Sequence, residues 1–174
     1  MIDRDITGRL EELGIRYAVI GAVGLAAHGW SRYTADVDLL TLERRVLEPA
    51  TWAGLPVPEI RTGGPDDPLV GLVRFDAEVV HDVIVGRGHA AHVAVDTAVR
   101  HSTLACPVAT PLALVLLKLE AGGPQDRHDI LGLVTAQRDL NGASWLSDVA
   151  AHVTSLSPEA RALWRALAPA VGAP

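Results

Sequence analysis

The chain has 174 residues, a length that suits one compact domain or a core with a small helical appendage. Its formal net charge is −6, so binding to nucleic acid through bulk positive charge is excluded and any such contact must rely on a local basic patch. The single cysteine, Cys106, excludes an internal disulfide and fits a reducing cytoplasm, and no apolar stretch reaches the ~18 residues expected of a membrane span.

The first elements predicted along the chain are a helix, a strand and a second, shorter helix. Asp3 or Asp5 is suited to cap the first helix, and Gly14 is suited to end it. Residues 15–20, IRYAVI, are typical of a strand. Gly21 interrupts this strand and begins a turn that leads into the short helix.

A second strand is predicted at residues 35–41, ADVDLLT. Because successive strand residues point to opposite faces, Asp36, Asp38 and Leu40 share one face and the intervening Val and Leu share the other.

The middle of the chain is predicted to be mixed in structure, and the rest is helical. The expected elements are a short helix at 42–47, a strand at 59–62, a strand pair at 69–76 and 79–85 that suits a hairpin, a helix at 89–100 and a strand at 104–108. From Thr110, a good helix cap that precedes Pro111, the pattern stays helical. We therefore expect an α/β (α+β) fold with a core at 1–109 and a helical part at 110–174 packed on this core. Residues 15–109 are expected to form a mixed sheet, flanked by helices on one face.

The chemistry-bearing segment is the glycine turn followed by the D-x-D strand. Carboxylates at positions i and i+2 of a strand project from one face and suit hard cations such as Mg²⁺. A glycine turn that enters a helix offers backbone N–H groups to phosphate. Alone, a D-x-D is more often a solvated strand face, and a glycine turn is more often only a turn. Their order and spacing together predict a site for a metal and a nucleotide.

This segment resembles the DNA polymerase β-type nucleotidyltransferase superfamily, specifically the bacterial proteins related to the AbiEii toxins. The family signature is G-G or G-S, a short helix, often H-G-x-x-R-x-T, and then D-[IV]-D-L. Here it reads Gly21-Ala22, His28-Gly29, Arg32, Thr34 and Asp36-Val37-Asp38-Leu39. A later family pattern, K-L-x-A followed by D-x-x-D-I, appears as Lys118-Leu119-Glu120-Ala121 and then Asp126, Asp129 and Ile130. The resemblance spans residues 15–135 in order.

The resemblance implies a nucleotidyltransferase core with three metal-binding carboxylates. Asp36 and Asp38 would hold two Mg²⁺ (or Mn²⁺) ions. The best candidate for the third carboxylate is Asp82, which would also help to deprotonate the attacking hydroxyl; otherwise it is an ordinary strand-end aspartate. Asp76 is the runner-up, although it lies nearer the predicted turn.

The resemblance also implies residues that bind the triphosphate. The turn at Gly21 and Ala22, together with Lys118, would hold the β- and γ-phosphates. A lysine in a helix as apolar as ALVLLKLEAG must either extend to solvent or meet an anion, and the motif favours the anion.

Three further residues have supporting roles in this interpretation. Arg32 and Thr34 would brace their loop or contact phosphate. Asp126 is a second-tier catalytic candidate, although Asp126 and Asp129 are also suited simply to begin a helix. His28 is expected to be structural.

Two departures from the family pattern bear on activity. Ala22 stands where the family has glycine or serine, so the hydroxyl of serine and the backbone freedom of glycine are both absent. The loop at 122–125, GGPQ, lacks the basic residue that the family often has there.

The sequence thus predicts an enzyme that transfers an NMP from a nucleoside triphosphate to an acceptor hydroxyl in the cytoplasm, with no membrane attachment. The resemblance points to tRNA or a protein as the acceptor, in a toxin–antitoxin system with a cognate antitoxin. A small-molecule transferase of the antibiotic-modifying type is the alternative, which the acidic composition favours. A catalytically reduced module that only binds a nucleotide or a partner is the third interpretation, and Ala22 and the uncharged loop favour it.

Overall fold

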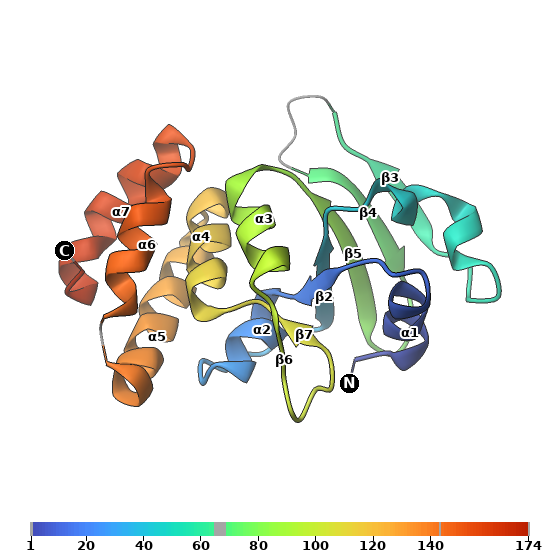
Figure 1. Cartoon of the computed structure of the whole chain (residues 1–174), viewed down its shortest axis with the longest axis horizontal. Helices are drawn as coiled ribbons and strands as arrows, with labels where there is room; N and C mark the ends of the chain where they lie inside the picture. The colour runs from blue at the N-terminus through green and yellow to red at the C-terminus, as the bar shows by residue number, and fades with distance from the viewer. Residues whose placement is uncertain (1, 65–68, 143, 174) are drawn as a thin grey trace.

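A computed structural model describes residues 2–64, 69–142 and 144–173 (Figure 1). In chain order the first elements are α1 (Arg4–Glu12), β1 (Tyr17–Val19), α2 (Gly21–Ala27), β2 (Asp36–Thr41), η1 (Arg44–Leu47), η2 (Pro49–Trp52), β3 (Glu59–Thr62) and β4 (Leu69–Phe75). The remaining elements are β5 (Val80–Gly86), α3 (Gly88–Asp96), β6 (Val99–Arg100), β7 (Pro107–Val108), α4 (Pro111–Ala121), α5 (Pro124–Asn141), α6 (Trp145–Val153) and α7 (Pro158–Val171).

The strands of the described ranges form one seven-stranded sheet in the order β3-β4-β5-β2-β1-β7-β6. Strand β2 runs parallel to β5 and antiparallel to β1, while β4 and β5 form the expected antiparallel pair. The sheet is therefore mixed, and the predicted α/β class with a sheet flanked by helices is confirmed.

The two faces of the sheet are buried in two separate hydrophobic clusters. Leu40 belongs to the cluster that contains α3 and the C-terminal helices. Val37 and Leu39, which alternate with it on β2, belong to a cluster that contains Ile6 of α1 and Trp52 of η2. Helices therefore flank both faces of the sheet, because buried residues of α1 and of the short helices η1 and η2 belong to the second cluster. Within residues 15–109, helices were expected on one face, and η1 and η2 depart from that expectation.

The C-terminal helices gather at one end of the molecule, at the left of Figure 1. Helix α4 begins where the sequence predicts, because the Thr110 hydroxyl accepts a hydrogen bond from the Ala113 amide at 3.3 Å. It ends at Gly122, which has a left-handed φ of 69°. Helix α4 contacts α5, α6 and α7, and it also contacts α3, which in turn contacts β1 and β2, so it links the helical part to the helix that lies against the sheet.

The segment between α3 and α4 differs from the prediction. The helix expected at 89–100 ends at Asp96, and the strand expected at 104–108 is only Pro107–Val108. The reason is a tight turn, in which the His101 amide donates to the Cys106 carbonyl and the chain returns as the β6–β7 pair. Such a pairing depends on contacts along the turn that periodicity does not reveal.

None of the described helices is both long and apolar enough to span a bilayer.

Candidate metal and nucleotide site

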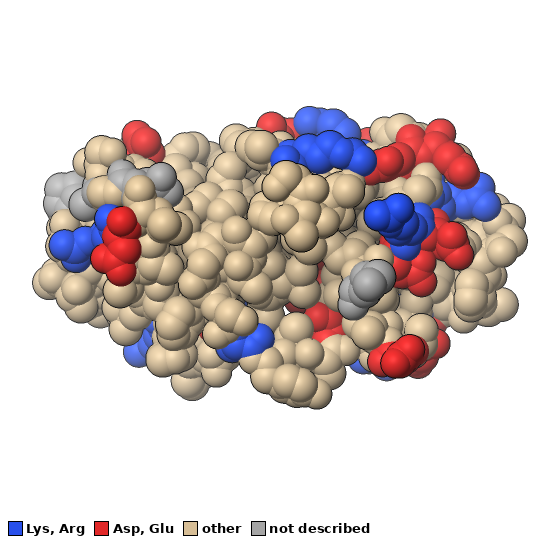
Figure 2. Space-filling view, turned by 90° about the horizontal axis from the view of Figure 1, so that it is seen from below, with Lys and Arg blue, Asp and Glu red and all other residues tan. Residues whose placement is uncertain are grey.

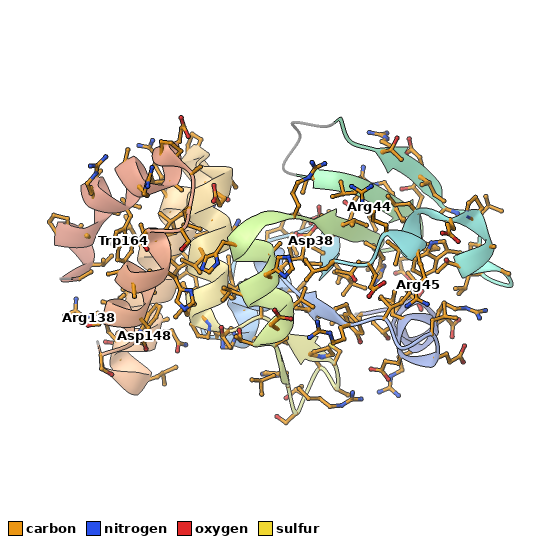
Figure 3. All side chains as sticks on the ribbon, turned by 45° about the horizontal axis from the view of Figure 1, so that its top comes forward. Asp38, Arg44, Arg45, Arg138, Asp148 and Trp164 are labelled. Carbon is orange, nitrogen blue, oxygen red and sulfur yellow. The ribbon has the colours of Figure 1, made fainter. Side chains whose placement is uncertain are left out.

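Three carboxylates meet on one face of the sheet, near the middle of the molecule, where Figure 3 labels Asp38. Asp36 and Asp38 lie on β2, and Asp82 lies on the neighbouring strand β5. Asp38 and Asp82 stand directly opposite each other in the parallel β2–β5 register. Each of the three offers a carboxylate oxygen, and these oxygens lie within 4.8 Å of one another.

The electrostatics of this cluster are unfavourable without a cation. Burial, together with the negative charges of Asp36 and Asp82, raises the pKa of Asp38 to about 6, although Lys118 and Arg32 oppose the shift. Oxygen ligands held this close suit Mg²⁺ or Mn²⁺, which would relieve the repulsion. The cluster therefore fits a divalent cation.

The glycine turn lies directly against the D-x-D strand. Gly21 has a φ of +59°, and a Cβ atom added there would lie 2.0 Å from Oδ2 of Asp38. The Ile20 amide also donates a hydrogen bond to the Asp38 carbonyl at 3.0 Å. Helix α2 begins at Gly21 itself, and Ala22 is buried in its first turn. Only glycine fits at position 21, because the backbone approaches Asp38 too closely for any side chain.

Lys118 meets anions within the protein. Its ammonium lies 2.8 Å from Oδ1 of Asp126 and 2.9 Å from Oδ2 of Asp129, and its side chain is only 14% exposed. Asp126 also accepts a hydrogen bond from the Gly123 amide at 3.0 Å and so caps α5. The two aspartates hold the ammonium at this position between α4 and α5.

Asp129 belongs to the D-x-x-D-I pattern, but the sequence did not reveal its burial or its partners. It is fully buried, and its carboxylate accepts hydrogen bonds from Arg32 at 3.1 Å, Gln125 at 3.0 Å and Trp30 at 3.4 Å. Burial acts to raise its pKa, but the hydrogen bonds from Lys118 and Gln125 and the positive charges of Lys118 and Arg32 together lower it. The spacing from Asp126 and the apolar neighbour that follows were the available signal, since they put Asp129 on the inner side of the helix.

The loop that connects α2 to β2 is braced by the residues of the H-G-x-x-R-x-T pattern. The Thr34 hydroxyl donates to the carboxylate of Asp36. Arg32 donates to the Tyr33 carbonyl as well as to Asp129. His28 bonds through Nε2 to the Ala109 carbonyl at 2.8 Å, which agrees with the structural role predicted for it.

Asp82 carries a further contact that the sequence did not predict. Arg74 of β4 donates from Nε to Oδ1 at 2.8 Å and from a terminal nitrogen to Oδ2 at 2.6 Å. Asp76, the runner-up for the third carboxylate, is exposed in the turn after β4 and lies outside the cluster.

No family model and no curated protein matches the chain. Solved structures do match it. The solution structure of the antibiotic-resistance factor ANT(2'')-Ia has a TM-score of 0.54 and 14% identity, over 97% of this chain and 92% of that chain. The chain has the nucleotidyltransferase fold.

Two further structures share this nucleotidyltransferase fold. A crystal structure of ANT(2'')-Ia in complex with adenylyl-2''-tobramycin has a TM-score of 0.54 and 12% identity, over 87% of this chain and 94% of that chain. A nucleotidyltransferase-like antigenic protein from Paracoccidioides brasiliensis has a TM-score of 0.52 and 14% identity, over 95% of this chain and 84% of that chain.

Proposed function

We propose that this chain is a divalent-metal-dependent nucleotidyltransferase that moves an NMP from a nucleoside triphosphate to an acceptor hydroxyl. The observation that carries the proposal is the cluster of Asp36, Asp38 and Asp82, whose oxygens lie within 4.8 Å of one another beside the Gly21 turn. An acidic cluster of this kind in a nucleotidyltransferase fold suits the transfer of a phosphoryl group.

The three aspartates would hold Mg²⁺ or Mn²⁺, and the metal, when bound, neutralises charge on the phosphates and on the leaving group. Asp82 would help to deprotonate the attacking hydroxyl once one of its oxygens is free of the Arg74 guanidinium. The acceptor oxygen then bonds to the α-phosphorus, and the bond from that phosphorus to the bridging oxygen breaks, so that pyrophosphate leaves.

In this proposal, backbone N–H groups and two cationic side chains bind the triphosphate. The N–H groups at the Gly21 turn, including that of Ala22, face the phosphates in this proposal. The positive charges of Lys118 and Arg32 lower the pKa of Asp38, so both cations lie near the carboxylate cluster. Their shared partner, the buried Asp129, fixes both cations before the nucleotide arrives.

For the acceptor, we propose a small cationic molecule with several hydroxyls. Two observations favour it over tRNA or a protein. The chain carries a net charge of −6, and on the face shown in Figure 2 its Lys and Arg side chains are interspersed with Asp and Glu. The similar structure with adenylyl-2''-tobramycin holds a nucleotidylated aminoglycoside. tRNA or a protein, the acceptors of a toxin with a cognate antitoxin, remains the second candidate because of the motif resemblance.

A transfer assay separates these acceptors. The purified chain is incubated with Mg²⁺, each of four α-³²P-labelled nucleoside triphosphates, and either a panel of aminoglycosides, total tRNA or cell protein. We expect label on an aminoglycoside, with transfer lost in Asp38→Ala and kept in Asp76→Ala. Label on tRNA or protein would support the toxin function instead. If no acceptor is labelled although the Mg²⁺-nucleotide binds, the chain is a nucleotide-binding module.

A further inference from the structure

A row of charged side chains crosses four neighbouring strands and ends in the metal cluster. The registers place Glu59 of β3 opposite Arg74 of β4, Arg74 opposite Asp82 of β5, and Asp82 opposite Asp38 of β2. Residues that stand opposite each other in adjacent strands share a face of the sheet. Arg74 is therefore built into the same surface as the metal-binding carboxylates, one strand away from Asp82.

Arg74 engages both oxygens of Asp82. The two nitrogen–oxygen distances are 2.8 and 2.6 Å, which is the geometry of a bidentate arginine–carboxylate pair. The Asp82 side chain is 7% exposed and that of Arg74 is 35% exposed, so the pair is partly shielded from water. A metal ion that binds Asp82 must share these oxygens with the guanidinium or displace it.

We infer that Arg74 is a positioning residue that occupies Asp82 and makes the site select a metal–nucleotide complex over the free metal ion. The inference rests on the proposed function. A guanidinium beside the cluster repels a free divalent cation, whereas it attracts the net negative charge of a metal–triphosphate complex. One charge thus shifts the two affinities in opposite directions.

Glu59 provides a second carboxylate beside Arg74 when the guanidinium is displaced from Asp82. It stands opposite Arg74 on the other side from Asp82, and its side chain is 47% exposed. Its partner in the structure is Arg61, which contacts it at 2.7 Å. When a metal ion binds Asp82, Arg74 still has the carboxylate of Glu59 on β3 as its neighbour.

The test measures the affinity of the full chain for Mn²⁺ in the absence of nucleotide. The electron paramagnetic resonance signal of unbound Mn²⁺ reports how much of the ion has bound. We expect Arg74→Gln to bind Mn²⁺ about tenfold tighter than the wild type, because one repelling charge is removed. Arg74→Lys, which keeps the charge, should stay close to the wild type. Arg61→Gln is the matched control, since it removes a guanidinium that pairs with Glu59, and it should also stay close to the wild type.

The opposite direction is expected with nucleotide. When Mn²⁺ is presented with a non-hydrolysable ATP analogue, Arg74→Gln should bind the complex more weakly than the wild type does, because one attracting charge is removed. A role of Arg74 in stability alone would leave both affinities unchanged. Arg74→Met, which keeps the aliphatic stem, serves for the same measurements if circular dichroism shows that Arg74→Gln is unfolded.

The inference is overturned if the uncharged variants bind Mn²⁺ no tighter than the wild type. In that case, binding of the metal–ATP analogue by the wild type would still uphold the proposed function. If neither Mn²⁺ nor the metal–analogue complex binds to any variant, both the inference and the proposed function fail.

Discussion

Gly21 and Asp38 touch because one of them has no side chain. The carboxylate of Asp38 occupies the volume in which any Cβ at position 21 would lie, and the positive φ of Gly21 adds a second restriction. The same carboxylate is crowded by Asp36 and Asp82. Two features thus determine the centre of the site. Position 21 has no room for a side chain, and the fold disfavours the ionised form of Asp38.

We expect Gly21→Ala to lower the free energy of unfolding by about 2–4 kcal/mol, because the new methyl group meets Asp38 and alanine disfavours a left-handed backbone. Urea denaturation measures the loss. Gly8→Ala in α1 is the control, since an added Cβ there has no neighbour within 4 Å, and it should be neutral or slightly stabilising. Equal stability of Gly21→Ala and the wild type would contradict the close contact.

The second prediction concerns Asp38 and pH in metal-free buffer. Its folded-state pKa of about 6 lies above the ordinary value of 3.8, so folding favours the protonated carboxyl. The contribution of Asp38 to stability is fully present below pH 3.8 and is lost as the pH rises through about 6. Asp38→Asn, which cannot ionise, should therefore be more stable than the wild type at neutral pH, by on the order of 2 kcal/mol.

Thermal melts in EDTA at pH 4 and pH 7.5 test this prediction, with the exposed Asp76→Asn as the control. The gain of Asp38→Asn should be present at pH 7.5 and nearly absent at pH 4. A lower melting temperature of Asp38→Asn at pH 7.5 would show that the carboxylate supports the fold rather than a metal.

At the scale of the elements, α4 and α5 are held together by a buried charge network. Asp129 of α5 is fully buried and binds Lys118 of α4 and Arg32 of the loop before β2. Gly132 of α5 leaves room for Trp30 of the same loop, because a Cβ there would lie 2.1 Å from the indole ring. The network therefore joins the loop that precedes the D-x-D strand to both helices.

We expect Asp129→Asn to lower the free energy of unfolding by about 3 kcal/mol at pH 7, because it leaves two partly buried cations without their shared partner. Asp126→Asn is the control, with a smaller loss of about 1 kcal/mol, since Asp126 is half-buried and mainly caps α5. The pKa of Asp129 is lowered, so its contribution is present above the ordinary value of 3.8 and is lost as the pH falls below it. The difference between Asp129→Asn and the wild type should shrink in acid, and a difference that does not change with pH would contradict the charge network.

The helix ends could be predicted from the sequence because their causes are local. Thr110, Pro111 and Gly122 set the limits of α4 through hydrogen bonds and backbone angles within a few residues. The strand of the D-x-D segment was equally clear, since alternation assigned Asp36 and Asp38 to one face. Local patterns of this kind are readable without the rest of the chain.

Contacts between distant segments were not readable in the same way. The pairing of Asp82 with Arg74 depends on the β4–β5 register, and the burial of Asp129 depends on how α5 packs on α4. Asp82 was chosen through the family resemblance and its apolar neighbours, and the structure places it beside Asp38. The hydrophobic periodicity of the sequence determines neither the register between two strands nor how deeply a residue of a helix is buried.

At the scale of the whole molecule, the candidate site lies where the sheet approaches the helical part. Asp38 is near the middle of the molecule in Figure 3, whereas Asp148 and Trp164 mark the helical end. The carboxylates come from the sheet, and Lys118 comes from α4, the helix that joins the two parts. In the proposed function, the metal ligands and the phosphate-binding cations thus come from different layers of the fold.

The most direct test of the proposed function is nucleotide binding with and without Mg²⁺, measured by isothermal titration calorimetry with non-hydrolysable analogues of the four nucleoside triphosphates. We predict that at least one analogue binds the wild type and Asp76→Asn in Mg²⁺, that EDTA abolishes this binding, and that Asp38→Asn does not bind even in Mg²⁺. Binding that is equally strong in EDTA, or that persists in Asp38→Asn, would contradict a metal-dependent nucleotide site at Asp36, Asp38 and Asp82.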